Sequence, residues 1–163
     1  MCHYCGCRDI PLIREFIAEH ESVTNLAGDF RRALQRGGTA TARVLVDRIS
    51  AELSAHWRGE EDGLFAVMAQ DPEYTAYIDD LVREHRELHA LLAAADLGDP
   101  GDADLVLTAL DGLHQHIAKE EDGLFPASLT ALSGPEWDFA MAAWRETPRP
   151  AKEPGHEPGT NRG

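Results

Sequence analysis

The sequence predicts an all-α protein, an up-down-up-down four-helix bundle with a short additional C-terminal helix. Four long stretches carry apolar residues at intervals of three and four, which is the period of an amphipathic helix. No stretch alternates apolar and polar residues as a half-buried strand would. The loops between the stretches are short, which favours antiparallel neighbours in a bundle.

The first helix is expected to begin with Asp9 as its N-cap and Pro11 in its first turn, and to end at the glycines 37 and 38. The second should run from about 41 to 70, where an Asp-Pro pair breaks the chain. Along both helices the apolar stripe is interrupted by polar residues near the middle. Such residues at core positions are candidates for a functional site.

The third helix is expected over 73–97 and the fourth from Asp102, with Pro126 kinking or ending it. Ser133 and Glu136 form a capping-box pattern that opens the short last helix. The expected units are a Cys-rich N-terminal segment (1–8), the four-helix bundle (9–132), the short C-terminal helix (133–147) and a disordered tail (148–163).

Two internal repeats relate the halves of the bundle. The first and third helices match at an offset of 65 residues, and the second and fourth at an offset of 60. The first set of matched pairs is Ile13/Ile78, Ile17/Val82, Glu19/Glu84, His20/His85 and Leu26/Leu91. The bundle is therefore expected to consist of two similar helical hairpins.

Size and charge limit the classes of protein. At 163 residues the chain fits one domain, and its formal net charge of −14 repels phosphate backbones, so nucleic acid and anionic membranes are unfavourable partners. No apolar run approaches the roughly 20 residues that span a bilayer, and the N-terminal residues lack a signal-peptide pattern. We expect a cytoplasmic protein without a membrane partner.

One motif occurs twice in the predicted second and fourth helices. Its copies are HWRGEEDGLF (56–65) and HIAKEEDGLF (116–125). In each copy a His precedes a Glu by four residues, which places both side chains on one helix face. The complete set of polar residues in the apolar stripes is His20, His56, Glu60, His85, His89, His116 and Glu120.

These side chains come from all four helices, so a bundle brings them to one level. An unpaired carboxylate in an apolar core costs several kcal/mol, and metal ions would compensate the charge. Imidazole and carboxylate ligands suit iron, manganese or zinc. Two carboxylates from facing helices can each bridge two ions, which favours a dinuclear site with iron as the first choice.

This pattern resembles the hemerythrin family, in the form called the HHE cation-binding domain, over about residues 10–130. The resemblance implies His20, His56, Glu60, His85, His116 and Glu120 as ligands of two non-haem irons, with both glutamates bridging. His89 matches the second His of a His-x3-His in the third helix of oxygen carriers. Those carriers have an Asp five residues after the fourth-helix His, where this chain has Glu121, so the pattern departs from simple oxygen carriage.

The family also contains iron-sulfur-cluster repair proteins, oxygen or iron sensors, and proteins that decompose peroxide. The resemblance thus implies a di-iron protein that binds O2, peroxide or NO in oxidative or nitrosative stress. Catalase-like peroxide decomposition stays open, as do a redox or gas sensor with an unknown protein partner and a metal-storage protein. Storage is the least favoured, because ferritin-like proteins use Glu-x2-His spacing.

The N-terminal segment is a second candidate site. Three cysteines and one histidine stand together there, namely Cys2, His3, Cys5 and Cys7. Such a set could bind zinc or another soft metal, or act as redox thiols. The glutamates and aspartates that follow each ligand glutamate in the motif are expected to be solvated or capping charges.

Overall fold

The computed structural model describes residues 6–150, which form helices joined by short turns. The elements are η1 (Cys7–Asp9), α1 (Pro11–Gln35), α2 (Thr39–Gly59), η2 (Glu60–Leu64), α3 (Phe65–Met68), α4 (Pro72–Ala94), α5 (Pro100–Lys119), η3 (Glu120–Leu124), α6 (Phe125–Ala131) and α7 (Gly134–Glu146). The η1 element is a 3-10 turn, whereas η2 and η3 are π-helical. No strand occurs within residues 6–150, which confirms the all-α prediction.

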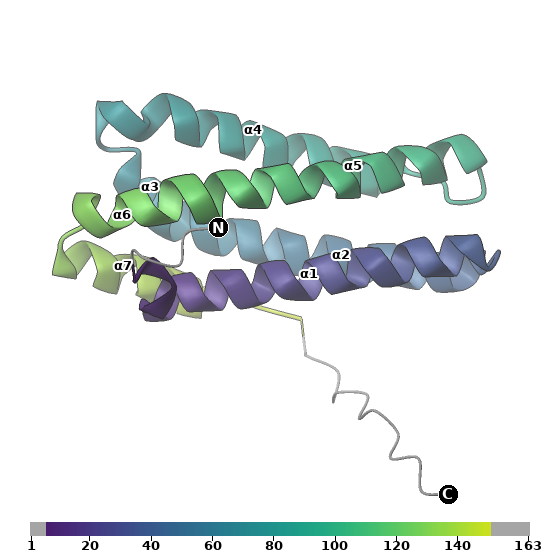
Figure 1. The fold of residues 1–163 in the computed structure, drawn as a ribbon, viewed down its shortest axis with the longest axis horizontal. Helices are drawn as coiled ribbons and strands as arrows, with labels where there is room; N and C mark the ends of the chain where they lie inside the picture. The colour runs from purple at the N-terminus through teal and green to yellow at the C-terminus, as the bar shows by residue number, and fades with distance from the viewer. Residues whose placement is uncertain (1–5, 151–163) are drawn as a thin grey trace, which may run out of the picture.

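Four long helices, α1, α2, α4 and α5, lie side by side along the length of the molecule (Figure 1). The α1–α2 and α4–α5 turns lie at one end, and the connection from α2 through α3 to α4 lies at the other. The short C-terminal helix α7 packs against η2 and the end of α2. A helical bundle with one additional short helix is therefore present.

Two Asp-Pro pairs begin helices where the sequence analysis expected a break or a later start. Asp71 caps α4 by accepting from the backbone N–H of Glu73 at 2.9 Å. Asp99 caps α5 in the same way, through the N–H of Gly101 at 2.7 Å. Each following proline takes the first helical position, where its missing N–H costs nothing. The fourth helix thus starts at Pro100, before the expected Asp102.

The other expected boundaries need three corrections. The N-cap of α1 is Ile10, because Asp9 belongs to the preceding 3-10 turn. Pro126 neither kinks nor ends its helix, because it lies in the first turn of α6 after the π-helical segment, where proline is tolerated. Arg149, which was expected in a disordered tail, is packed and donates to Glu19; the rest of that tail, 151–163, lies outside the described residues.

The capping box of α7 is present as expected. The Glu136 carboxylate accepts from the backbone N–H of Ser133 at 2.7 Å. Among the described residues, no helix carries an apolar stretch long enough to cross a bilayer.

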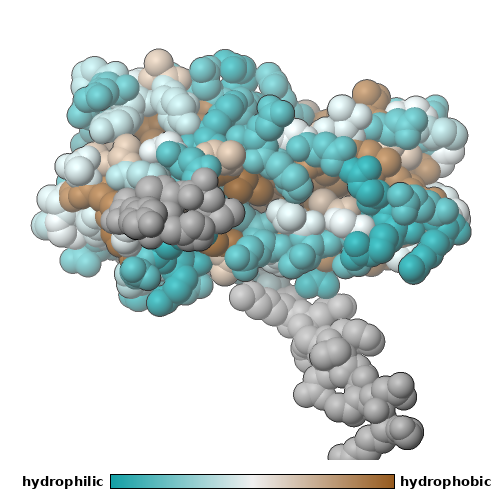
Figure 2. Space-filling view, viewed as in Figure 1, coloured by the Kyte–Doolittle hydropathy of each residue, from teal (hydrophilic) through white to brown (hydrophobic). Residues whose placement is uncertain are grey.

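The core consists of two apolar clusters at different levels of the bundle. One contains Phe30, Ile49 and Val106, near the α1–α2 and α4–α5 turns. The other contains Phe16 and Phe125 and is covered by Ala140 of α7. Figure 2 shows hydrophilic residues over much of the viewed face, with hydrophobic ones gathered along the lines between helices. The polar residues of the predicted site lie between the two clusters.

Candidate metal centre

Four buried histidines meet between the apolar clusters, one from each long helix. His20 of α1 faces His56 of α2, with their Nε2 atoms 3.0 Å apart. His85 of α4 faces His116 of α5 at 2.9 Å between the same atoms. All four residues are at most 7% exposed. The histidines therefore form two pairs, one in each helical hairpin.

A carboxylate holds the outer nitrogen of every one of these rings. The Nδ1–carboxylate pairs are His20–Glu121 at 3.0 Å, His56–Glu19 at 2.9 Å, His85–Glu61 at 2.8 Å and His116–Glu84 at 2.8 Å. An ionised carboxylate only accepts hydrogen bonds, so each Nδ1 donates. The neutral ring then presents the lone pair of Nε2 to the centre.

Two lone pairs that face each other at 3 Å repel unless a cation lies beside them. Two imidazole nitrogens that bind one ion at about 2.1 Å each, at a right angle, are about 3 Å apart. The Nε2 distances within both pairs equal this separation. Each pair is thus spaced as two neighbouring ligands of one ion.

Two fully buried carboxylates complete the centre. None of the four side-chain oxygens of Glu60 and Glu120 has a hydrogen-bond partner within residues 6–150. Glu120 lies between the pairs, with Oε2 3.1 Å from His20 Nε2 and Oε1 2.9 Å from His116 Nε2. Glu60 Oε2 lies 3.3 Å from His56 Nε2 and 3.7 Å from His85 Nε2. Buried carboxylates without donors are costly, and cations would satisfy them.

The six side chains form two groups that could each hold a metal ion. One group is His20, His56, Glu60 and Glu120, and the other is His85, His116 and Glu120. The groups share Glu120, so the donor set fits two neighbouring ions with a common carboxylate.

The π-helical segments begin at the two central glutamates. In η2 and η3 the wider i→i+5 turn separates successive side chains by a smaller angle than an α-helix does. Glu60 can therefore face the centre while the next residue, Glu61, accepts from His85. Glu120 and Glu121 do the same in the second half. The repeated Glu-Glu thus supplies one inner and one outer carboxylate.

Aromatic rings fix the planes of the histidines. Phe65 stacks on His85 at 5.8 Å between ring centroids, and Phe125 stacks on His20 at 6.0 Å. Trp57 covers the other side of His85 at 4.9 Å. The phenylalanine that ends each copy of the motif therefore packs on a histidine of the opposite hairpin.

The pKa values of the two central glutamates are shifted in opposite directions. Burial raises the pKa of Glu60 well above its usual range, and the charge of Glu120 raises it further. Burial acts in the same sense on Glu120, but the imidazoles of His116, His20 and His85 hold its pKa well below the usual range. In the absence of metal, the centre therefore favours a proton on Glu60 over one on Glu120.

The pKa values of the first histidine pair also separate. Burial opposes protonation of His20, but Glu120 and Glu121 raise its pKa to about 9. Burial lowers the pKa of His56 to about 4, although Glu19 acts against it. One proton is thus shared unequally within this pair when no cation is bound.

The structure brings together six of the seven residues predicted for the main site. His89 is the exception: its side chain is exposed, and its Nδ1 lies 3.5 Å from Ser54 Oγ, away from both groups. His89 lies one turn beyond His85, and there its ring meets Trp57 edge-on at 6.5 Å between ring centroids rather than the centre. Cys2, His3 and Cys5 lie outside the described residues, as does the side chain of Cys7.

The outer carboxylates were not predicted from the sequence. Glu61 and Glu121 were expected to be solvated or capping charges, but each accepts from a buried histidine. Glu19 and Glu84 were noted only as a matched pair of the repeat. Their position directly before a core histidine, in both halves, was the signal that could have identified them.

Fold and site together define an all-helical protein with a buried cation-binding centre of imidazoles and carboxylates. The family model described as the hemerythrin HHE cation-binding domain matches residues 12–128. The chain belongs to this family. No curated protein and no solved structure gave a match.

Proposed function

We propose that this chain is a non-haem di-iron protein that binds O2 or peroxide at the His/Glu centre and acts in oxidative or nitrosative stress. The observation that carries the proposal is the convergence of four imidazole nitrogens on two buried carboxylates without hydrogen-bond donors. This donor set suits iron, with manganese or zinc as substitutes. The four long helices, taken as an up-down-up-down bundle, bring these groups to one level.

Iron bound there would supply a redox couple for O2 or peroxide. The protein's own groups prepare the site. Glu60 and Glu120 provide negative charge between the histidine pairs, and the outer carboxylates fix each ring with Nε2 inward. The two apolar clusters shield the centre from bulk water on both sides along the bundle. This shielding lets small uncharged molecules compete with water, and peroxide decomposition is a candidate activity.

The test is to purify the protein anaerobically with Fe(II), count the metal, and add O2 or H2O2 while recording the visible spectrum and gas release. Two irons per chain with steady O2 evolution from H2O2 indicate a peroxide-decomposing enzyme. A reversible coloured species without turnover indicates a carrier or sensor. Less than one iron, or zinc alone, would contradict the di-iron assignment.

Replacing a central glutamate tests the ligand set directly. Glu60→Ala or Glu120→Ala should abolish binding of two irons, because each removes a buried charge that the ions require. Glu21→Ala is the matched control, since Glu21 is an exposed glutamate next to His20. A Glu120→Ala protein that retained two irons would falsify the proposed ligand set.

One contact favours a redox sensor as the second candidate. Arg8, directly after Cys7, donates to Glu121 Oε2, and Glu121 Oε1 in turn accepts from His20. A change of charge at the centre could therefore reach the Cys-rich segment through a single arginine. If the protein is a sensor, the rate of thiol alkylation should differ between reduced and oxidised iron, and Arg8→Ala should remove the difference. Equal alkylation rates in both states would reject this candidate.

A further inference from the structure

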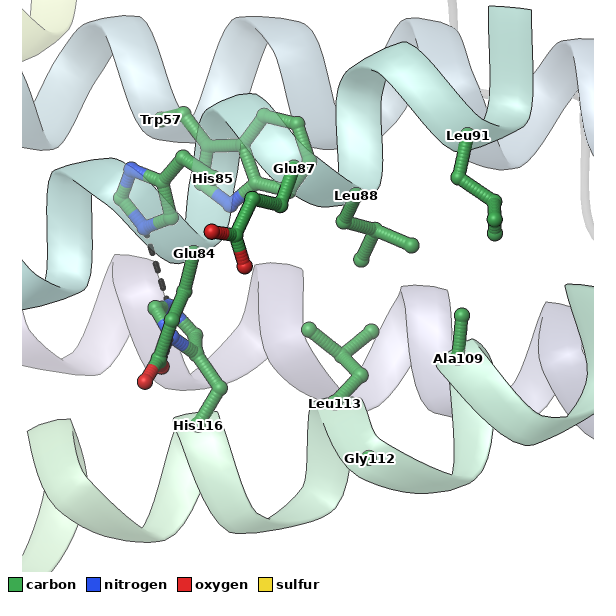
Figure 3. Close-up of a pocket in the computed structure, with 10 residues that line it drawn as sticks. All are labelled: Trp57, Glu84, His85, Glu87, Leu88, Leu91, Ala109, Gly112, Leu113 and His116. Atoms are coloured by element: carbon green, nitrogen blue, oxygen red, sulfur yellow. Dashed lines mark hydrogen bonds and ion pairs between the residues drawn. The ribbon is translucent and has the colours of Figure 1, made fainter. Parts of the chain in front are cut away.

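A cavity of about 320 Å³ lies between α4 and α5 and reaches only one of the two histidine pairs. His85 and His116 stand at its inner end, as Figure 3 shows, with Glu84 and Glu87 beside them. Beyond the histidines the cavity is apolar, and its walls are Leu88, Leu91, Ala109 and Leu113. The cavity is wide enough for several small molecules of the size of O2.

The other histidine pair has no such access. A cavity of about 140 Å³ beside α1 and α2 is lined by Glu19, Ser22 and Glu52, but it touches neither His20 nor His56. The space that does touch both histidines is lined on its far side by Leu113 and His116 and leaves no room for a water-sized molecule. The repeat offsets of 65 and 60 residues allow the two hairpins to be compared residue by residue. The two hairpins therefore share their ligands but differ in access.

Three substitutions within the repeat account for the difference. Ile49, fully buried, stands where the second half has Ala109. Glu52 stands where the second half has Gly112, and Ser22 stands where it has Glu87. The Ser22 hydroxyl donates to Glu52 Oε2 at 2.7 Å. A Cβ on Gly112 would meet no atom within 4 Å. The open half thus carries Ala109 and Gly112 where the closed half carries the larger Ile49 and Glu52.

The ligand groups show the same asymmetry. The group at the closed half has four members, among them Glu60, whereas the group at the open half has three. An ion with fewer protein ligands has more room for an added molecule. Access and the smaller group of candidate ligands therefore coincide at His85 and His116.

We propose that a small uncharged molecule such as O2 or NO enters through the α4–α5 cavity and binds at the ion held by His85 and His116, while the ion held by His20 and His56 is sealed from it. This inference rests on the proposed function. The apolar walls admit uncharged molecules, and Glu84 and Glu87, with the net charge of −14, disfavour anions.

A second cavity of about 330 Å³, between α2 and α4, also touches His85 but not His116. Charged side chains line it, among them Arg58, Glu61 and Arg86. Such walls hold water and favour ions over O2. The α2–α4 cavity is the competing route, and its blockage serves as the control.

The experiment copies the closed half onto the open half with the triple variant Glu87→Ser, Ala109→Ile, Gly112→Glu. The single variant Gly112→Leu adds a side chain to the wall of the cavity, at a position where a Cβ meets no atom within 4 Å, and it serves if the triple variant does not fold. Ser54→Leu blocks the α2–α4 cavity. For each protein the iron content is counted first, and the rate constant for NO binding to the Fe(II) form is then measured by stopped flow.

We expect the cavity-filling variants to retain two irons and to bind NO more slowly by a factor on the order of ten, with Ser54→Leu unchanged. Unchanged NO binding in the cavity-filling variants would overturn the proposal, as would slow binding in Ser54→Leu alone. A crystal structure with NO on the ion of His20 and His56 would overturn it as well.

Xenon provides a readout that needs no iron. Apolar cavities bind xenon, so crystals of the metal-free protein under xenon pressure should show it between α4 and α5, and crystals of the triple variant should not. Absence of xenon there in the wild-type protein would contradict the apolar entry route. If the wild-type protein binds xenon but loads no iron, the proposed function fails while the cavity assignment stands.

Discussion

At the scale of single residues, the centre depends on how each imidazole is held from outside. Glu19 is the most constrained of the outer carboxylates: Oε2 accepts from His56 Nδ1 at 2.9 Å, and Oε1 accepts from Trp144 Nε1 at 3.1 Å and Arg149 Nε at 2.7 Å. Burial works to raise the pKa of Glu19, but His56 and Arg149 outweigh it, so the pKa is lowered and the group stays charged.

Glu19→Gln keeps the size of this side chain and removes its charge. We expect a loss of metal affinity of about 10- to 100-fold, because an uncharged partner makes His56 a weaker ligand. Competition with a chelator of known affinity measures this. Glu21→Gln, the same change at the exposed neighbouring glutamate, should have no effect. Equal affinities for the two variants would show that Glu19 does not orient the ligand.

Metal binding at pH 7 should release protons. With its pKa raised to about 9 from 6.5, His20 carries a proton at pH 7 in the metal-free protein. The stability from this proton is complete below pH 6.5 and is lost as the pH rises through about 9. A metal ion must displace the proton.

Calorimetry of metal binding in buffers with different ionisation enthalpies counts the protons released. The count should decrease as the pH is raised from 7 through about 9, because metal-free His20 loses its proton over this range. Identical heats in all buffers at pH 7 would contradict the assignment of a bound proton.

At the scale of elements, the π-helical segments connect the motif to the rest of the fold. Gly63 in η2 lies against α7, and a Cβ there would be 2.9 Å from the backbone oxygen of Ala140. In η3, the Tyr77 hydroxyl donates to the Lys119 carbonyl at 2.8 Å, next to Gly123. The glycine in each copy of the motif thus allows a close approach: α7 contacts the first copy, and a tyrosine the second.

Gly63→Ala should destabilise the protein by about 1–3 kcal/mol, because α7 would have to move away from η2. Gly112→Ala is the control within α5, where the added methyl meets nothing within 4 Å. This control should be neutral or stabilise by up to about 1 kcal/mol, since alanine is the better helix former. Urea unfolding of both variants measures the difference. Similar stabilities would mean that α7 does not pack closely on η2.

At the scale of the whole molecule, two similar hairpins enclose a charged layer between two apolar clusters. Outer carboxylates link the hairpins in both directions, since Glu61 of the first holds His85 and Glu121 of the second holds His20. The hairpins therefore support each other's ligands. When no cation is bound, the buried charge of this layer lacks compensation, because the oxygens of Glu60 and Glu120 have no hydrogen-bond donors within residues 6–150.

Removal of the metal should therefore lower the thermal stability. At a free metal concentration of a hundred times Kd, binding adds about 2.7 kcal/mol, which corresponds to a rise in Tm on the order of 5–10 °C for a chain of this size. Scanning calorimetry with metal and with chelator measures it. The double variant Glu60→Gln, Glu120→Gln should have a Tm that metal does not change. A wild-type Tm equal under both conditions would contradict binding in the core.

The sequence determined the helical class, the duplicated hairpin and six of the central residues. Helical periodicity and short loops specify a bundle locally. A His or Glu inside an apolar stripe is evident without coordinates, because its burial needs a compensating charge. The same reasoning assigned His89 wrongly to the interior, since periodicity gives the face of a helix but not how far that face is covered by its neighbours.

Tertiary structure decided which groups surround the ligands and which half is open. The bonds from Glu61 to His85 and from Glu121 to His20 join residues 24 and 101 positions apart, so no local pattern predicts them. The π-helical turns that aim each Glu-Glu pair depend on packing. The α4–α5 cavity is lined by Ala109 and Gly112, where the other hairpin has the larger residues Ile49 and Glu52. The spacing of residues fixes which side chains share a face, whereas contacts across helices fix the space left between them.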